Sequence, residues 1–296
     1  MSQSFENLKI SLRTIIIYTN IEFNLENIFS NIIICNLNSI PLTKKKQNID
    51  KKNIIAPYGA IIGSLNKNKF RGLDLRKQKR KKSNTFFRNQ TTLYFSLGDK
   101  YLLHVMISKN CIKIAGCKCD KDALIACRIL WEDYINKDIN MWKIKDEHTY
   151  VEFISDTVMQ NVNFFLGFPL NLEYLNNLLN DKYRDEILLS YYSNRSHKTV
   201  KIKRPLSIPS KKIYHQLLYD LKNFETPIFA VINENKYSKR ISKKTVTILV
   251  FKSSKIVISG KYLENMKKDY DFFINIAINN REKLLQEIIK PTKTVI

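Results

Sequence analysis

Five cysteines come closest to a chemical site in this sequence, and all of them precede residue 128. Cys117 and Cys119 are separated by one residue, and with Cys111 and Cys127 they raise the hypothesis of a zinc site. Zinc-binding pairs normally have about two to four residues between them, and the histidines add no matching spacing. We therefore predict reduced, buried or half-buried thiols in a strand and a helix, with no metal and no cofactor.

Motifs typical of nucleotide-driven or hydrolytic enzymes are missing from the sequence. The seven glycines form neither a GxGxxG nor a GxxxxGK[ST] pattern, so no phosphate-cradling loop is visible. HExxH and GxSxG do not occur either, and no histidine stands near a candidate nucleophile. We predict that the protein is not an enzyme.

The composition favours a partner with dense negative charge. The 296 residues include 50 Lys and Arg against 27 Asp and Glu, which gives a formal net charge of +23. Nucleic acid is the first candidate for the partner, and an anionic membrane is the second. Because no apolar run reaches the roughly 20 residues of a spanning helix, and MSQSFENLKI lacks signal-peptide features, we expect an intracellular protein without a membrane partner.

Two stretches of the chain resemble each other at a separation of 144 residues. Residues 106–116 and 250–260 both have the pattern of a strand, a polar turn, a second strand and a glycine, and 260 minus 116 gives the offset. Each is followed by apolar residues at helical spacing on one face. The pattern predicts a hairpin and then a long amphipathic helix in each half.

A second pair of similar stretches lies earlier in each half. Residues 23–28 match residues 170–175, and 171 minus 24 gives an offset of 147. In both, a β-rich run leads through Asn24 or Asn171, a suitable N-cap, into a short amphipathic helix. Each half is therefore predicted to contain a strand, a helix, several strands and a long helix.

These elements predict an α+β fold of two tandem pseudo-symmetric repeats, residues 1–140 and 141–296. An antiparallel sheet with its helices on one face leaves the other face uncovered, so two copies can join into one long curved sheet. The alternative is two unrelated α+β domains that share a hairpin and a helix by chance.

Two basic segments separate the shared elements. The first, at about 66–90, is expected to stay mobile until an anion orders it; its cations are Arg71, Arg76, Lys77, Lys79, Arg80, Lys81 and Lys82. The second, at about 180–223, is interpreted as a loop flanked by short helices; it carries Arg195, Lys198, Lys201, Lys203, Arg204, Lys211 and Lys212. A solvated loop or a nuclear-import signal is the alternative for either.

The strand pairs carry a resemblance to the TATA-box-binding protein family. Residues 247–261 (TILVFKSSKIVISGK) resemble the core of the family's second repeat, with Ser254 in place of a turn glycine and Ser259 in place of a threonine. Residues 168–173 (FPLNLE) and 224–229 (FETPIF) resemble two further second-repeat segments, in the correct order. The first half matches less well, through residues 23–28, 58–62 and 115–118. The divergence and the many Ile, Asn and Lys residues look like the related proteins of large DNA viruses, and a compact-genome eukaryote is the alternative source.

The resemblance implies a saddle, in which a curved antiparallel sheet carries its helices on the convex face. The concave face would bind the minor groove of duplex DNA and bend it by pressing apolar side chains between base steps. By the motif match, Phe229 and Phe251 are the second-half wedges. Tyr58 and Ile107 are their first-half counterparts, where the family has Phe, so we expect the first half to kink DNA weakly or to read a different sequence.

The resemblance also implies polar contacts with DNA. Asn161 has the position of a family asparagine that hydrogen-bonds central base edges, and Asn163 lies on the same strand face. The first half offers Thr14 at the offset of 147, and Ser259 would present a hydroxyl at the groove floor. The family's phosphate-binding lysines correspond to Lys118 and Lys255, with Lys261 one position out of register with another.

The resemblance implies a transcription-initiation factor at AT-rich promoters. Its expected partners are duplex DNA, a general initiation factor of the TATA-complex-binding kind and RNA polymerase, with the protein partners on the helical face (122–135 and 266–289). The expected location is the nucleus or a cytoplasmic viral factory of the host cell, with packaging in the virion as a further expectation. The alternatives are an architectural or single-strand nucleic-acid-binding module without promoter specificity, and a nucleic-acid enzyme such as a glycosylase.

Overall fold

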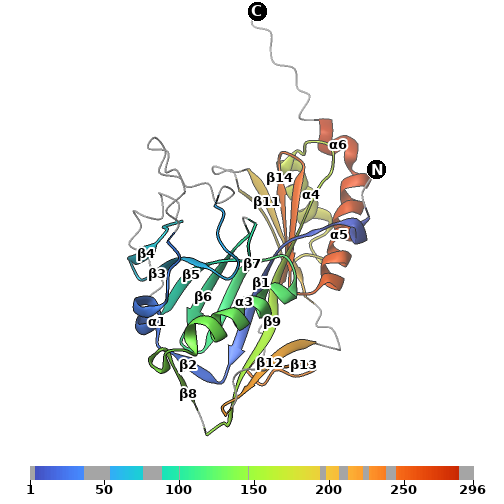
Figure 1. Ribbon diagram of the computed structural model, residues 1–296. Coiled ribbons are helices and arrows are strands. Elements are labelled where there is room, and N and C mark those ends of the chain that lie inside the picture. Colours follow the sequence, from blue (N-terminus) through green and yellow to red (C-terminus); the bar gives the residue numbers. More distant parts are fainter. Residues whose placement is uncertain are drawn as a thin grey trace, which may run out of the picture. The chain divides into compact units, whose positions relative to one another are not determined.

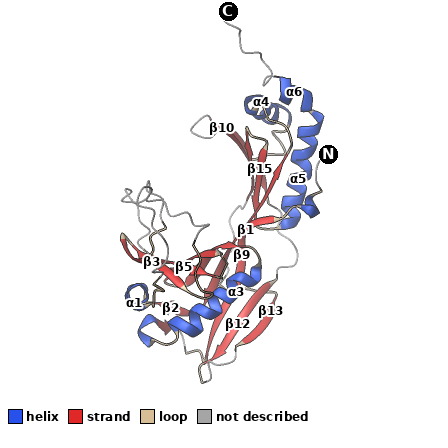
Figure 2. Cartoon of the chain, turned by 45° about the horizontal axis from the view of Figure 1, so that its top comes forward, coloured by secondary structure: helices blue, strands red, loops and turns tan. Residues whose placement is uncertain are grey.

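The protein has an α+β fold with a large antiparallel sheet and few helices (Figure 1). The computed structural model describes residues 4–36, 54–75, 89–99, 101–145, 147–193, 198–206, 213–222, 227–237 and 245–286. Within these ranges, no helix has both the length and the apolar character needed to cross a membrane. Figure 2 separates the strands from the helices that accompany them.

The chain forms two compact units. Unit 1 comprises residues 1–12, 158–210 and 239–296, and unit 2 comprises residues 13–157 and 211–238. This division departs from the predicted boundary at residue 140. Strands β1 (Ile10–Thr19) and β9 (Tyr150–Phe165) each contribute residues to both units, and a segment from the second half of the chain belongs to unit 2.

Unit 2 contains the antiparallel strand order β1-β7-β6-β5-β3-β4. These strands are β3 (Ile61–Asn66), β4 (Lys69–Gly72), β5 (Gln90–Ser96), β6 (Leu102–Ser108) and β7 (Cys111–Cys117). The N-terminal part of β9 pairs with β12 (Tyr214–Asp220), which pairs in turn with β13 (Ile228–Ile232). A small separate sheet joins β2 (Ile21–Phe23) to β8 (Trp142–Ile144).

The helices of unit 2 share one core with its strands. They are α1 (Leu25–Asn31), α3 (Asp120–Ile129), a π-helical continuation of α3 (Leu130–Ile135) and a short 3-10 helix (Ile139–Met141). Trp131 is buried in this core and packs its ring edge-on against Phe153 of β9, with 5.4 Å between the ring centroids. Alternate residues of β6 and β7, such as Val105 and Ile114, point into the same core.

Unit 1 contains the antiparallel strand order β10-β11-β14-β15-β9. Its elements are a 3-10 helix (Phe5–Asn7), α4 (Leu172–Lys182), β10 (Leu189–Ser193), β11 (Thr199–Pro205), β14 (Thr245–Phe251), β15 (Lys255–Gly260), α5 (Leu263–Asn279) and α6 (Arg281–Gln286). Leu175 of α4 and Phe273 of α5 are buried in one cluster with Val162, Ile248 and Ile258 of the strands. Helices α4 and α5 therefore cover one face of these strands.

Both predicted N-caps are confirmed. The backbone N–H of Asn27 donates to Asn24 Oδ1 at 3.2 Å, and the backbone N–H of Tyr174 donates to Asn171 Oδ1 at 3.1 Å. Each bond satisfies a helix N–H that has no partner within the helix. The predicted long helices after the two hairpins are also present, as α3 and α5.

The second basic segment differs from its prediction. Instead of a loop flanked by short helices, residues 180–223 contain β10, β11 and β12. In β11, buried Val200 and Ile202 alternate with Lys201 and Lys203, which is the period of a strand with one covered face. In the first segment, Arg71 lies in β4, and the cations from Arg76 to Lys82 fall outside the described residues, as do Arg195, Lys211 and Lys212.

Candidate nucleic-acid interface

The strands of unit 1 have a second face, opposite the helices. In β14, buried Val246, Ile248 and Val250 alternate with Thr247 and Leu249, which are less buried. We call the surface opposite the helices the open face of unit 1. It is formed by Leu189 and Tyr191 of β10, Lys201 and Lys203 of β11, Thr247, Leu249 and Phe251 of β14, Lys255, Val257 and Ser259 of β15, and Asn161, Asn163 and Phe165 of β9.

The strand register places cations and amides in rows across the open face. One row runs from Lys203 through Thr247 and Ser259 to Asn161. The next row runs from Lys201 through Leu249 and Val257 to Asn163. Directly opposed residues of neighbouring strands lie about 4.5 to 5.5 Å apart, so each row is a continuous surface. Polar groups that suit a nucleic acid are thus set into an apolar sheet.

The two asparagines have hydrogen-bonding capacity to spare. Asn161 Oδ1 and Asn163 Oδ1 are shielded from solvent and have no hydrogen-bond partner in the described part of the chain. A shielded polar atom without a partner is costly, by about 1–3 kcal/mol. Rotating an amide exchanges its acceptor and donor ends, so either can be turned toward a ligand. Both side chains are suited to bond an incoming base edge.

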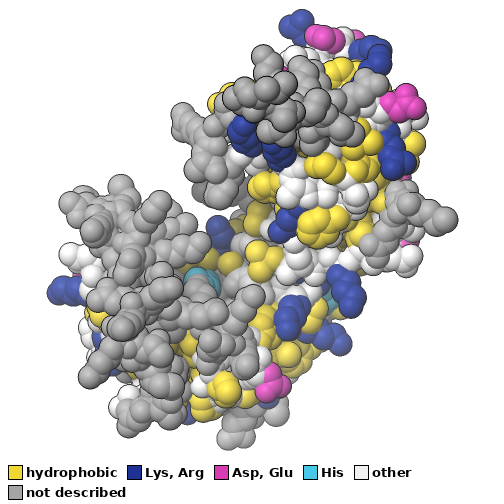
Figure 3. Space-filling model, turned by 90° about the horizontal axis from the view of Figure 1, so that it is seen from above, with side chains coloured by type: hydrophobic (Ala, Val, Ile, Leu, Met, Phe, Trp, Pro, Cys, Tyr) yellow, Lys and Arg dark blue, Asp and Glu magenta, His cyan; other side chains and the backbone are white. Residues whose placement is uncertain are grey.

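Aromatic side chains lie on the open face beside these polar groups. Phe165, opposite Lys255 at the end of β9, is 67% exposed, and Tyr191 of β10 is also exposed. Phe251 is half-buried at the end of β14, on the strand face opposite the helices. Figure 3 shows a surface on which Lys and Arg side chains lie among hydrophobic ones. The open face therefore combines charge with large apolar side chains.

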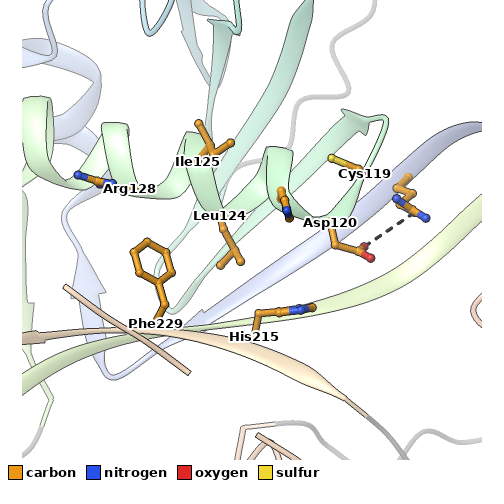
Figure 4. Close-up of a pocket in the computed structure, with 9 residues that line it drawn as sticks. Cys119, Asp120, Leu124, Ile125, Arg128, His215 and Phe229 are labelled. Atoms are coloured by element: carbon orange, nitrogen blue, oxygen red, sulfur yellow. Dashed lines mark ion pairs between the residues drawn. The ribbon is translucent and has the colours of Figure 1, made fainter. Parts of the chain in front are cut away.

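Phe229 does not lie on the open face, which corrects its prediction as the partner of Phe251. It belongs to β13 in unit 2 and lines a pocket with helix α3 (Figure 4). The strand that pairs with β14 in its place is β11, which begins at Thr199. The segment 224–229 resembled the family motif, but β12 and β13 form a hairpin that pairs with β9.

Ile107 is also wrong as a wedge, because it is 0% exposed in the core of unit 2. The cause is the length of the hairpin turn. In unit 2, Ser108 pairs with Cys111 and two residues form the turn, whereas three residues separate Phe251 from Lys255. The strands after the two turns are related by an offset of 144, but the strands before the turns are related by an offset of 143. The first-half counterpart of Phe251 is therefore Ser108, since 251 minus 143 gives 108. A shift of one residue moves a strand side chain to the opposite face.

The other first-half positions are spread over unit 2. Tyr58 is exposed in a turn before β3, and Thr14 of β1 is buried opposite Ala115 of β7. The face of β5 that carries Tyr94 is itself covered, because Tyr94 is buried in a second small cluster with Ile54, Ala56, Ile62 and Leu75. The second face of β5 and β3 in unit 2 is therefore covered, whereas the corresponding face of β10 and β11 in unit 1 is open.

The three predicted phosphate-binding lysines differ in position. Lys255 lies on the open face of unit 1, and Lys118 is exposed in unit 2, with its Nζ 4.2 Å from the centre of the Tyr101 ring. Lys261 is only 7% exposed and lines a cavity of about 200 Å³ with Thr247 and Ser259. A buried lysine does not suit a phosphate contact, so that prediction is corrected. The strand cations Lys201 and Lys203 were not predicted as site residues.

Three cysteines occupy a strand and a helix as predicted, whereas Cys35 lies outside both and Cys119 is exposed. Cys111 and Cys117 belong to β7, Cys119 precedes α3, and Cys127 is buried within α3. Burial raises the pKa of the Cys117 thiol to about 12, with the carboxylates of Asp122 and Asp120 adding to the effect. Within the described ranges no group of three or more His, Cys, Asp or Glu residues is placed to hold a metal ion.

Comparison with models of known protein families and with the sequences of curated proteins gives no match. The geometry of the open face is therefore the basis on which a function can be assigned.

Proposed function

We propose that this protein binds duplex DNA through the open face of unit 1 and acts as a transcription-initiation factor of the TATA-box-binding kind. The observation that carries the proposal is the composition of that face. Asn161 and Asn163 of β9 have unsatisfied amide oxygens, and Phe165 of the same strand is exposed beside them. Lys201 and Lys203 of β11 lie in the same rows, three strands away from β9. The opposite face of the same strands is occupied by α4 and α5.

The minor groove suits this surface better than the major groove does. It is shallow and presents mainly acceptors at A·T pairs, with one added donor at G·C pairs. A broad apolar sheet can lie against such a groove, while a few amides hydrogen-bond the base edges. Leu249 and Val257 supply the apolar centre, and lysines at the margins can reach phosphates.

The proposal includes a duplicated architecture, which the strand registers support. Thr14, Ile16 and Tyr18 of β1 pair with Ala115, Lys113 and Cys111 of β7, and Asn161, Asn163 and Phe165 of β9 pair with Ser259, Val257 and Lys255 of β15. An offset of 147 relates the two first strands, as 161 minus 14 shows, and an offset of 144 relates the two second strands. The same two offsets relate the repeated stretches of the sequence.

The order of strands supports the same duplication. The first long strand, β1 in unit 2 and β9 in unit 1, pairs with the strand that precedes the long helix, β7 or β15. That strand pairs in turn with its own hairpin partner, β6 or β14. Two more strands follow, as β5 and β3 in unit 2 and as β11 and β10 in unit 1. Protein partners such as a general initiation factor and RNA polymerase are then proposed for the helices, α3 and α5.

A second candidate function is single-strand or architectural binding without promoter specificity. The exposed rings of Phe165 and Tyr191 favour it, because bases of any sequence stack on aromatic side chains. The presence of Ser108 where the second half has Phe251 also favours weaker kinking. Equal affinity for AT-rich duplex, random duplex and single strands would support this candidate over the first.

A binding and bending experiment tests the proposal. A duplex of AT-rich sequence with a fluorophore at each end should bind in moderate salt and show a shorter end-to-end distance. The double variant Lys201→Ala/Lys203→Ala should lose about two phosphate contacts. Because each contact contributes about 0.9 to the slope of log K against log salt, the slope should become less steep by about 1.8. Lys182→Ala, an exposed cation at the end of α4, is the matched control.

The proposal fails if no binding is found, or if the double variant behaves like the Lys182 control. Binding without a change in the end-to-end distance would retain DNA as the ligand and would exclude bending.

A further inference from the structure

The hairpin of β12 and β13 presents an unprotected edge. Strand β13 pairs with β12 on one side, and no strand among the described residues pairs with its other side. Its sequence, IFAVI, contains no charge, and Phe229 and Val231 are 57% and 67% exposed. Free edges offer rows of unpaired N–H and C=O groups, and proteins usually protect them with charges or coverage. This edge is therefore available to another strand.

A groove lies between this hairpin and α3. Leu217 of β12 is fully buried beneath the helix, but Phe229, directly opposite it in register, is not covered. We call the resulting space of about 550 Å³ the hairpin groove; its lining residues are Leu124, Ile125, Cys119, Asp120, Lys121 and Arg128 of α3 and its N-cap, Arg13, His215 and Phe229. Figure 4 shows Leu124 projecting from α3 and Phe229 projecting from β13 into the space between the helix and the hairpin.

The hairpin is held in place by a buried carboxylate. Glu152 of β9 is 2% exposed, and its Oε1 lies 2.5 Å from Lys236 Nζ, on the segment that follows β13. Its other oxygen accepts a hydrogen bond of 2.9 Å from Gln216 Nε2 of β12, and Tyr237 Oη also donates to Glu152. A buried charge with several partners fixes its surroundings, so the groove is formed before any ligand arrives.

The charges around the hairpin groove favour an acidic occupant. Asp120, its one carboxylate, is already engaged, because it lies 3.8 Å from Arg13 and accepts a hydrogen bond from Thr157 Oγ1. Arg128 bonds Glu132 one turn along the helix, and Lys121 makes no ion pair with any described residue. A second copy of this chain would bring another net charge of +23 to the same place and be repelled.

We propose that the hairpin groove binds an extended acidic segment of a partner protein, which adds to β13 as a further strand. Backbone groups of the segment would bond the free edge, and a large apolar side chain would enter between Leu124 and Phe229. Lys121 and Arg128 are seven residues apart, or about 10 Å along α3. Acidic residues two positions before and after the apolar residue would be about 13 Å apart on the same strand face. The difference of about 3 Å is one that the flexible side chains of lysine and arginine can span.

A designed peptide tests this proposal, which does not rest on DNA binding. The probe is the fluorescein-labelled peptide TTDTFTETT, and the control peptide TTKTFTKTT has lysines in place of both acids. The acidic peptide should bind the full chain about tenfold more tightly than the control. On peptide addition, hydrogen exchange should slow at the outward amides of β13.

Variants of exposed residues locate the binding. Phe229→Ser and Lys121→Glu should each lower the affinity of the protein for the acidic peptide by about tenfold. Ile278→Ser and Lys182→Glu, an exposed apolar residue of α5 and an exposed cation of α4, should leave its affinity unchanged. Equal affinity for both peptides, or an acidic-peptide affinity that Phe229→Ser does not change, would overturn the proposal. A dimer in sedimentation that Phe229→Ser dissociates would also overturn it and assign the edge to a second copy.

Discussion

Asn161 of β9 lies directly opposite Ser259 of β15 on the open face of unit 1. The side chain of Asn161 retains an unpartnered, shielded oxygen, and a hydroxyl stands beside it on the next strand. Groups of this kind distinguish base edges, whereas lysines contact backbone phosphates, a contact that does not read sequence.

The double variant Asn161→Ala/Asn163→Ala should therefore lose sequence preference. We expect the ratio of affinities for AT-rich over GC-rich duplex to fall about tenfold, because one good base contact is worth about 1–3 kcal/mol of discrimination. The slope of log K against log salt should stay the same. Titrations at several salt concentrations measure both quantities, with Asn180→Ala on α4 as the control. A changed slope with an unchanged ratio would contradict the assignment.

Ile107 and Phe251 should respond to truncation in opposite ways. Ile107→Ala leaves a cavity in a closed core, so the free energy of unfolding should fall by about 2–5 kcal/mol. Phe251→Ala should cost less stability and should reduce the bending of bound duplex. Chemical denaturation and end-to-end distance measurements separate the two effects. A stability loss under about 0.5 kcal/mol for Ile107→Ala would contradict its buried position.

Much of the fold follows from local signals in the sequence. Asn24 and Asn171 were predictable as N-caps because a short polar side chain directly before an apolar helical pattern can accept a hydrogen bond from a free N–H of the first turn. The hairpins and their long helices followed from periodicity. The residues of the open face were predicted only in part. Asn161 and Phe251 were assigned to this surface through the resemblance to the TATA-box-binding family.

The remaining errors have physical causes. Ile107 was misplaced because a turn shorter by one residue inverts the faces of the strand before it. Phe229 was misplaced because order along the chain does not reveal which strand a segment pairs with. Lys201 and Lys203 were assigned to a loop on their charge, although their alternation with Val200 and Ile202 was a strand signal.

Asp269 of α5 should make stability depend on pH. Burial raises the pKa of this carboxyl to about 6, and Arg204, whose Nε lies 2.8 Å away, opposes the shift without cancelling it. The folded chain therefore holds this proton more tightly than the unfolded chain. The contribution to stability is fully present below about pH 4 and is lost as the pH rises through about 6.

The variant Asp269→Asn tests this linkage. Between pH 4.5 and 7.5, the free energy of unfolding of the wild type should fall relative to that of the variant, by on the order of 2 kcal/mol. Denaturant titrations at several pH values measure the difference, and Asp271→Asn, exposed on the same helix, should show no such trend. A relative gain of the wild type with rising pH would show that the Arg204 ion pair outweighs burial.

The thiols should react in an order set by burial. Cys119 is exposed and should react first with a disulfide reagent at pH 7.5. Cys117 and Cys127 are buried and burial raises the pKa of both, so they should stay unmodified until the chain unfolds. Mass spectrometry of the labelled peptides identifies each site. Rapid labelling of Cys127 in the native protein would contradict the packing of α3.

The central claim, that the open face of unit 1 reads the minor groove, is tested most directly by exchanging A·T pairs for inosine·cytosine pairs. The exchange changes the major-groove pattern, but inosine lacks the guanine N2 amino group, so the minor groove stays like that of A·T. We predict that the wild-type affinity changes by less than about twofold on this exchange and falls by about tenfold when guanine replaces inosine. A loss with inosine as large as the loss with guanine would contradict the claim.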